Sequence, residues 1–563
     1  MRVSVKEWVK SGQPWVWLTG GAVALNVIMV AGLLLLIAVR GLGHFWPAAV
    51  MDAQYPESDG SVSMIVGEVA DVERVPAIQM REAGYVVADG VEFVRRNLIK
   101  VGNRDLSGSD FRWVTEAELQ QVQYSDLLFV AERREWGNFY GYLRQLKQAG
   151  ESVGSFEPGQ PDQQYDQLWS ELQQRIERAE AIQQQINAIE KHQIGTINSR
   201  FERLRLQQRR LELEQSLNAA AQADISAERA SLDLQYQQLQ QQLVELYGQI
   251  ERDSLVAEVA GGQRVEISLS KVVQAYRPNA MNVLQKTGFY FGQLWSFMSE
   301  EPREANTEGG VFPAIFGTVM MVLLMAILVT PFGVIAAVYL REYAKQGPLT
   351  RLIRIAVNNL AGVPSIVYGV FGLGFFIYFL GGNIDQLFFP EALPAPTFGT
   401  PGLMWASLTL ALLTLPVVIV ATEEGLSRIP RAIREGSLAL GATKAETLWK
   451  VVLPMASPAM MTGVILAVAR AAGEVAPLML VGVVKLAPSL PLDGNYPFVH
   501  LDQKFMHLGF HIYDVGFQSP NVEAARPLVY ATALLLVVVI ALLNISAVAI
   551  RNRLREKYKA LEH

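Results

Sequence analysis

Two residues of opposite charge, Arg470 and Glu474, lie inside a long apolar block of the C-terminal half of the chain. In a helix that follows Pro454, a rise of 1.5 Å per residue places Arg470 roughly 20 Å along, near the middle of a bilayer. An arginine at that depth costs at least about 2.5–3.5 kcal/mol, so it is a candidate functional residue. Its planar guanidinium donates two parallel hydrogen bonds, which suits a tetrahedral oxyanion. The pair therefore predicts an anion site on a pathway through a membrane.

Glu474 is predicted to lie one helical turn beyond Arg470 and on the same face. There it can orient the guanidinium and keep it from holding an anion too tightly. Monoprotonated phosphate also offers an O–H donor that a carboxylate can accept, whereas sulfate has none. The alternative interpretation is a structural ion pair that locks the helices together, and the sequence leaves both possibilities open.

A second pattern lies in a loop rich in basic residues, before the apolar block that contains Arg470. It consists of an acidic residue, two small residues, a glycine after three further positions, and a Leu-Pro pair: Glu435, Gly436, Ser437, Gly441, Leu453 and Pro454. A short helix at about Ser437–Leu440 is expected to dock into a separate subunit, because small residues permit close approach. Gly441 is predicted to end that helix, and Pro454 to begin the next one.

This spacing resembles the EAA loop of importer-type ABC permeases, with Gly436 in place of the usual alanine. Three further segments resemble the PstA family, the permease subunits of phosphate importers: 358–372 (NNLAGVPSIVYGVFG), 414–424 (TLPVVIVATEE) and 469–478 (ARAAGEVAPL). The resemblance covers about residues 312–550. It implies that Arg470 and Glu474 lie on a phosphate path and that the chain has no ATPase site of its own. It also implies a PstC-like second permease, a PstB-like ATPase dimer and a PstS-like periplasmic binding protein.

The elements that must position these residues are membrane helices. The chain has 563 residues, of which 51% are hydrophobic and only 18% charged, with a mean hydropathy of +0.21. Blocks of about 20 apolar residues, the length that crosses a bilayer, are found at 18–39, 312–340, 360–380, 402–421, 455–484 and 528–550. The first block is too long for the core of a cleavable signal peptide. The sequence thus predicts an all-α polytopic membrane protein with about six spans, and the resemblance implies the MetI-like permease type.

Basic residues alternate between the connecting loops, which predicts the orientation of the spans. Lys and Arg cluster after the second, fourth and sixth blocks, whereas the loop at 381–401 has none. Both termini are therefore expected in the cytoplasm, and the basic tail at 551–563 with them, in a bacterial inner membrane. Glu423 and Glu424, after the fourth block, are expected to pair with Arg428 or Arg431.

A long polar segment, about 41–310, separates the first apolar block (within 1–40) from the permease core at 311–550. We predict a periplasmic α+β insertion with β-rich flanks at 84–94 and 256–270. Leucine and isoleucine spacing over about 163–252 predicts an antiparallel coiled-coil arm. Breaks are expected at Gly195 and at Asn218–Ser226, which gives an arm about 40 Å long. The arm could reach the binding protein or a partner permease, or act as a spacer.

Other classes of function receive little support from the composition. The chain has no cysteine, and its six histidines form no metal-ligand pattern, so we predict neither a metal nor a cofactor. The net charge of -6 does not favour a nucleic-acid partner. The sequence offers no nucleophile–base constellation for an enzyme. The remaining alternatives are a permease for another oxyanion, such as sulfate or molybdate, and a membrane sensor that signals through the coiled coil.

Overall fold

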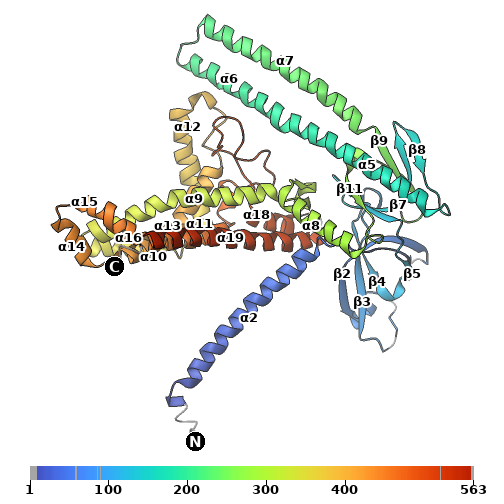
Figure 1. The fold of residues 1–563 in the computed structure, drawn as a ribbon, viewed down its shortest axis with the longest axis horizontal. Helices are drawn as coiled ribbons and strands as arrows, with labels where there is room; N and C mark the ends of the chain where they lie inside the picture. Colours follow the sequence, from blue (N-terminus) through green and yellow to red (C-terminus); the bar gives the residue numbers. More distant parts are fainter. Residues whose placement is uncertain (1–8, 58–59, 85–86, 89, 520–521, 559–563) are drawn as a thin grey trace.

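A computed structural model of the chain describes residues 9–57, 60–84, 87–88, 90–519 and 522–558. The ends of the predicted N-terminal segment and basic tail, residues 1–8 and 559–563, lie outside the described residues. The rest forms a bundle of long apolar helices, a β-rich domain, and a helical arm that projects from that domain (Figure 1).

The described residues contain six helical segments long and apolar enough to cross a membrane, which confirms the predicted number. The segments are Gln13–Gly43, Phe312–Tyr343, Ser365–Phe388, Leu403–Arg428, Lys444–Ala472 and Ala525–Arg553. Their helices are α2 (Gln13–Gly43), α9 (Phe312–Val338), α11 (Ser365–Phe371), α12 (Gly382–Phe388), α13 (Leu403–Arg428), α15 (Lys444–Thr447), α16 (Leu453–Ala472) and α19 (Val522–Tyr558). Shorter helices outside the spans are α8 (Val283–Ser299), α10 (Pro348–Leu360), α14 (Arg431–Ala439), α17 (Leu478–Val481) and α18 (Leu508–Tyr513).

Helix α13 is the centre of the bundle and packs against α9 on one side and α16 on another. Small residues bring α13 and α16 close together. A Cβ atom added to Gly463 would lie 2.7 Å from the Ala421 Cβ, and one added to Gly425 would lie 2.5 Å from the Ala459 Cβ. Such contacts are typical of membrane helices, because dispersion rather than the hydrophobic effect holds them together.

The third span begins later than predicted. The sequence suggested a start at Leu360, but the amphipathic helix α10 ends there and the span begins at Ser365. Pro364 lies between them with extended backbone, and a proline ring disfavours helical geometry in the residue before it. The stretch at 361–364 is therefore a turn and not membrane helix.

Helix α2 lies apart from most of the bundle (Figure 1). Its apolar side chains are exposed along most of its length, and the 18-residue window that qualifies it as a span has no buried residues. Near its C-terminal end, Gly41 packs against α19, where an added Cβ would lie 2.9 Å from the Ala531 nitrogen. This helix thus offers a long apolar surface to lipid or to another subunit.

The segment between α2 and α9 contains two main antiparallel sheets. The first sheet has the strand order β4-β3-β2-β1-β5, and the second has the order β10-β9-β7-β6-β11 with β8 paired to β7. Their bounds are β1 (Val50–Pro56), β2 (Val62–Pro76), β3 (Phe93–Lys100), β4 (Phe111–Thr115), β5 (Gln120–Gln123), β6 (Leu128–Arg133), β7 (Phe139–Gln148), β8 (Glu151–Ser155), β9 (Asp253–Glu258), β10 (Arg264–Ser268) and β11 (Val272–Tyr276). Short helices α3 (Ala77–Glu82) and α4 (Arg104–Ser107) connect strands, and the small hairpin β12 (Pro302–Arg303) and β13 (Glu308–Gly309) precedes α9.

The predicted β-rich flanks are confirmed in type but not in extent. The stretch at 256–270 contains β9 and β10, joined by a turn at Gly261 and Gly262, whose φ angles are +87° and +84°. Two such residues favour a tight hairpin, because glycine adopts positive φ without strain. Among the described residues of the stretch at 84–94, only Phe93 and Val94, which begin β3, lie in a strand, so the strand prediction holds only at the end of this stretch.

The helical arm is formed by α5 (Asp162–Asn187), α6 (Gly195–Leu213) and α7 (Ala219–Ile250). The expected break at Gly195 does not occur. A π-helical turn at Ala188–Ile194 joins α5 to α6, and Gly195 keeps helical angles. The outgoing leg, from the start of α5 to the end of α6, is therefore about 78 Å long at 1.5 Å per residue, and the returning leg, α7, is about 48 Å long. The two legs are antiparallel neighbours, while true coiled-coil winding stays a prediction.

The arm is fixed at its root and touches the permease core near its tip. At the root, Arg175 and Asp253 form a buried ion pair at 2.8 Å. Near the tip, Arg210 of α6 pairs with Glu391, a buried carboxylate in the loop that follows α12. The arm therefore lies over the loop that connects the third and fourth spans (Figure 1).

Candidate substrate pathway and coupling surface

Arg470 and Glu474 form an ion pair, with 3.6 Å between the Arg470 Nε and the Glu474 Oε1. Their side chains are 34% and 22% exposed, so neither is sealed inside the bundle. The pair does not lie on one continuous helix as predicted. Helix α16 ends at Ala472, Gly473 follows as its C-cap, and Glu474 lies in the turn that leads to Pro477. The sequence prediction extended this span to residue 484 because the residues remain apolar after the helix stops.

The depth of Arg470 follows from the packing of α16 against α13. These helices run antiparallel, with Gly463 facing Ala421 and Val418. Arg470 is seven residues further along α16, so it lies beside residues 411–414 of α13, close to the centre of that span. Helix α16 therefore ends within the bundle. Non-helical backbone at membrane depth is tolerated where protein buries it or where it lines a water-filled cavity.

The segment after Glu474 packs tightly on the third span. A Cβ added to Gly369 would lie 2.7 Å from the Pro477 Cα, and one added to Gly372 would lie 2.9 Å from the Val481 side chain. Two segments distant in the sequence, 358–372 and 469–478, are thus brought together beside the ion pair. Only glycine permits this approach of the two backbones.

Tyr368 is a residue of this region that the sequence analysis did not single out. It is buried, its hydroxyl donates to the Leu360 carbonyl at 2.6 Å, and the charge of Arg470 acts on it. The sequence did contain one signal for this residue. Helix α11 begins directly after Pro364, so Tyr368 is a polar side chain in the first turn of an otherwise apolar span.

The loop before the fifth span forms an exposed helix, α14, at the end of the bundle (Figure 1). It runs from Arg431 to Ala439 and is longer than the predicted Ser437–Leu440. Gly441 ends it with a φ angle of +89°, as predicted, and its amide donates to the Leu438 carbonyl. Next to Gly441, Leu440 is 91% exposed, the highest value among the large exposed apolar side chains of the described residues.

The remaining residues of this loop fill structural roles or stay exposed. Glu435 and Gly436 lie on the exposed surface of α14, and Ser437 shares a 2.9 Å hydrogen bond with Thr447 of α15. Leu453 and Pro454 begin α16, as predicted, although the membrane span of which α16 is part already starts at Lys444. Pro454 has no amide hydrogen to donate, and the turn before it, Leu448–Val452, is π-helical.

Ion pairs attach this loop to the bundle. Arg434 pairs with Glu342 at 2.9 Å and donates to the carbonyls of Ile429 and Leu426. Glu423 pairs with Arg354 at 3.3 Å, which corrects the expected pairing with Arg428 or Arg431. Each pair joins the loop after one of these spans to the end of the other span, Arg434 to the second span and Arg354 to the fourth, so the two loops are held at the same end of the bundle.

Comparison with known proteins agrees with this architecture. Residues 329–556 match the family model for a binding-protein-dependent transport system inner membrane component. The phosphate transport system permease protein PstA 1 of Mycobacterium tuberculosis (strain CDC 1551 / Oshkosh) is 38% identical over 248 residues, which cover 43% of this chain and 71% of that protein. The probable PstA of Methanocaldococcus jannaschii is 29% identical over 45% of this chain and 79% of that protein.

A solved structure of the MetNI methionine ABC transporter covers 43% of this chain and 94% of the matched chain, at 20% identity and a TM-score of 0.32. That score is too low to support an argument about this fold. The sequence matches and the six-span bundle define the class of protein: the chain is a membrane permease subunit of an ABC importer. Its relatives at 34–38% identity are phosphate transport permeases that it covers over 71–81% of their length. The chain belongs to the PstA family.

Proposed function

We propose that this chain is the transmembrane permease subunit of an ATP-driven importer of inorganic phosphate and forms half of the substrate pathway. The observation that carries the proposal is the Arg470–Glu474 pair at the broken end of α16, next to the glycine-packed third span. The pair lies at membrane depth and its side chains remain partly exposed. Contact with a polar solute explains this better than a purely structural role does.

The chemistry of the pair favours phosphate over other oxyanions. The Arg470 guanidinium can donate two hydrogen bonds to adjacent oxygens of a tetrahedral anion. Glu474 can accept the O–H of monoprotonated phosphate, a donor that sulfate and molybdate dianions lack. The negative charge of Glu474 also opposes tight binding, which a transport path requires because the anion must leave again.

Coupling to ATP hydrolysis is assigned to the loop that contains α14. Its residues Glu435, Gly436 and Gly441 lie in a helix and turn that have an open outer surface. A separate, PstB-like ATPase dimer would receive this helix in a surface cleft. The two ion pairs that join the loop to its neighbour would transmit movement into α9 and α13.

Two further partners complete the proposed assembly. A PstC-like permease would supply the other half of the pathway, and the exposed apolar surface of α2 is available to it. A PstS-like binding protein would deliver phosphate at the side of the membrane that carries the β-rich domain and the arm.

The proposal is tested by reconstituting the chain with these partners and measuring ATP hydrolysis. We expect phosphate with its binding protein to stimulate hydrolysis, and sulfate or molybdate to have no such effect. Stimulation by sulfate would favour the alternative oxyanion permease. Failure of the chain to co-purify with any ATPase would favour the coiled-coil sensor.

Orientation can be tested on the arm, because the chain has no native cysteine. Gln222 is exposed in the first turns of α7, close to the tip. We expect Gln222→Cys to react with a membrane-impermeant maleimide added to intact spheroplasts, since the insertion is assigned to the periplasm. Leu440→Cys, in the coupling loop, is the matched control and should react only after the membrane is opened. The reverse pattern would overturn the proposed topology.

A further inference from the structure

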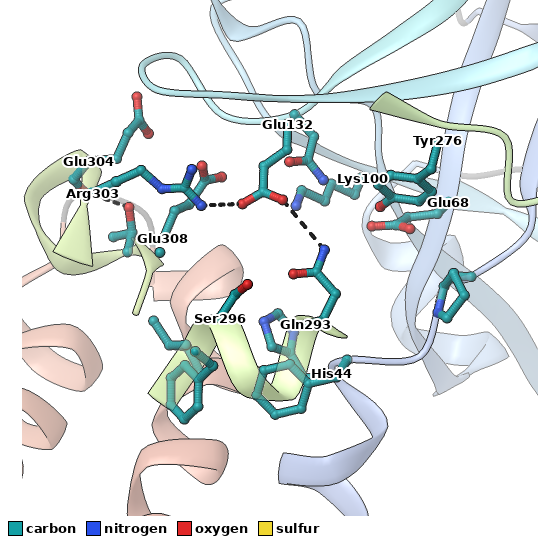
Figure 2. A pocket seen from close by; sticks show the side chains of 18 of the residues that line it. His44, Glu68, Lys100, Glu132, Tyr276, Gln293, Ser296, Arg303, Glu304 and Glu308 are labelled. Carbon is teal, nitrogen blue, oxygen red and sulfur yellow. Dashed lines mark hydrogen bonds and ion pairs between the residues drawn. The ribbon is translucent and has the colours of Figure 1, made fainter. Parts of the chain in front are cut away.

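A cavity of about 390 Å³ lies where the β-rich domain meets the membrane helices. Figure 2 shows it lined by residues from several elements, among them His44 after α2, Gln293 and Ser296 of α8, and Glu308 of β13. We call it the interface cavity. Part of its lining is apolar, from Phe45, Phe297 and Leu528 of α19. It thus lies at the level where α2 ends and α19 begins, which is the surface of the membrane.

The charged part of the lining has an excess of carboxylates. Six acidic and three basic side chains line the cavity. Two of the basic ones are engaged: Arg303 pairs with Glu132, and Arg104 pairs with Glu304 at 3.1 Å. The third, Lys100, forms no ion pair with another described residue. The excess of negative charge indicates a cationic ligand.

Glu308 is the carboxylate least satisfied by the protein. Its Oε2 atom is buried and has no hydrogen-bond partner. Burial raises the pKa of Glu308 to about 7, although the positive charge of Lys100 opposes that rise. Glu68, on the far side in β2, accepts a hydrogen bond from Tyr140 and has a second carboxylate oxygen to offer.

The chemical class of the cation is inferred from the arrangement of the carboxylates and from the neighbouring cavity on the membrane side. No group of three or more acidic or histidine side chains in the described part of the chain could hold a metal ion. A primary ammonium does not need three protein ligands, because one carboxylate can accept one of its N–H groups while water accepts the others. A second cavity shares His44, Glu68 and Lys100 with the first and extends to Arg40 of α2 and Arg526 of α19. Arg526 is exposed and forms no ion pair with another described residue.

We propose that the interface cavity binds the headgroup of a phospholipid of the ethanolamine type. Glu308 accepts a hydrogen bond from its primary ammonium, Glu68 adds negative charge from the far side of the cavity, and Arg526 at the entrance faces its phosphate. The lipid enters between α2 and α19, and its acyl chains stay in the bilayer. The charges in the two cavities, cations at the membrane side and carboxylates further in, are complementary to such a headgroup, whose phosphate lies nearer the acyl chains than its ammonium does. The bound lipid would fix the β-rich domain on the membrane surface.

The test uses the full chain in its membrane complex, placed in nanodiscs of phosphatidylethanolamine and phosphatidylcholine with identical acyl chains. Lipid retained after transfer to detergent is measured by mass spectrometry. We expect phosphatidylethanolamine to be enriched over phosphatidylcholine, whose quaternary ammonium has no N–H donor. Glu308→Gln should reduce this enrichment about tenfold, the effect of one charge-assisted hydrogen bond. Arg526→Gln should reduce the retention of both lipids without changing their ratio.

Glu301→Gln is the matched control, because Glu301 lies seven residues before Glu308 and outside the cavity. It should leave the enrichment unchanged. Absence of enrichment in the unmodified chain, or an equal loss in Glu301→Gln, would overturn the proposal. If soluble ethanolamine at the same concentration as the lipid removes the enrichment, the phosphate and acyl chains add no affinity and the lipid assignment is wrong. Should Glu308→Gln fail to assemble, Glu68→Gln provides the same measurement.

Discussion

Replacing Arg470 with glutamine is expected to lower phosphate transport at least about 30-fold, the effect of losing about 2 kcal/mol of hydrogen bonding between a charged donor and the anion. The substitution removes the bidentate donor and leaves the Glu474 carboxylate facing the pathway alone. Arg470→Lys should restore only part of the rate, since an ammonium cannot donate two parallel hydrogen bonds in one plane. Transport of labelled phosphate by the reconstituted complex gives the measurement.

The competing structural interpretation makes a different prediction for the same variant. If the pair only locks helices, Arg470→Gln should prevent assembly, and co-purification with the other subunits would be lost. Arg144→Gln is the control, because it breaks a comparable pair with Glu258 in the β-rich domain, away from the proposed pathway and from the coupling loop. We expect it to change stability but not the dependence of the rate on phosphate. Normal transport in Arg470→Gln would remove this pair from the pathway altogether.

The second large effect is expected at Gly441. Its φ of +89° is a conformation that β-branched residues avoid, at a cost of about 1–3 kcal/mol. A Cβ atom added at Gly441 would meet nothing within 4 Å, so the effect of Gly441→Val should come from the backbone and not from a clash. We expect normal amounts of protein in the membrane, but phosphate-stimulated ATP hydrolysis reduced about tenfold or more, because the turn after α14 changes direction.

Two companion variants separate this explanation from general damage. Gly441→Asn should be milder, since asparagine tolerates positive φ better than valine does. Gly262→Val applies the same change at a φ of +84° in the β9–β10 turn, also with open space around it. It should leave stimulation intact. Equal losses in Gly262→Val and Gly441→Val would mean that strain alone, and not the coupling loop, explains the result.

The membrane helices could be predicted from the sequence because length and hydropathy are local properties. The six spans follow from them, and the spacing from Glu435 to Gly441 predicted the exposed helix and its glycine end. The end of α16 could not be predicted in this way. The residues after Ala472 are as apolar as those before it, and the break at Gly473 depends on how Pro477 packs against Gly369.

The insertion shows the same limit. The helical arm was predicted from its leucine spacing, but Gly195 was interpreted as a break. In the structure the π-helical turn at Ala188–Ile194 leads directly into α6, so the helix continues at Gly195. Tyr247 of the returning leg donates a hydrogen bond to Glu190 in that turn. Most strands were not predicted from the sequence because they are short. They also lie in two sheets, where the buried side chains can be on either face of a strand. The contact between Arg210 and Glu391 joins residues distant in the sequence, and no local pattern indicates it.

The central claim is that this chain conducts phosphate in an ATP-driven complex, and uptake by proteoliposomes tests it most directly. The complex of this chain with its partner permease, ATPase and binding protein should accumulate labelled phosphate when ATP is supplied on the ATPase side. Sulfate in excess should not compete, and the Arg470→Gln complex should accumulate little. Accumulation of sulfate at the rate of phosphate, or phosphate uptake that persists without ATP, would contradict the account.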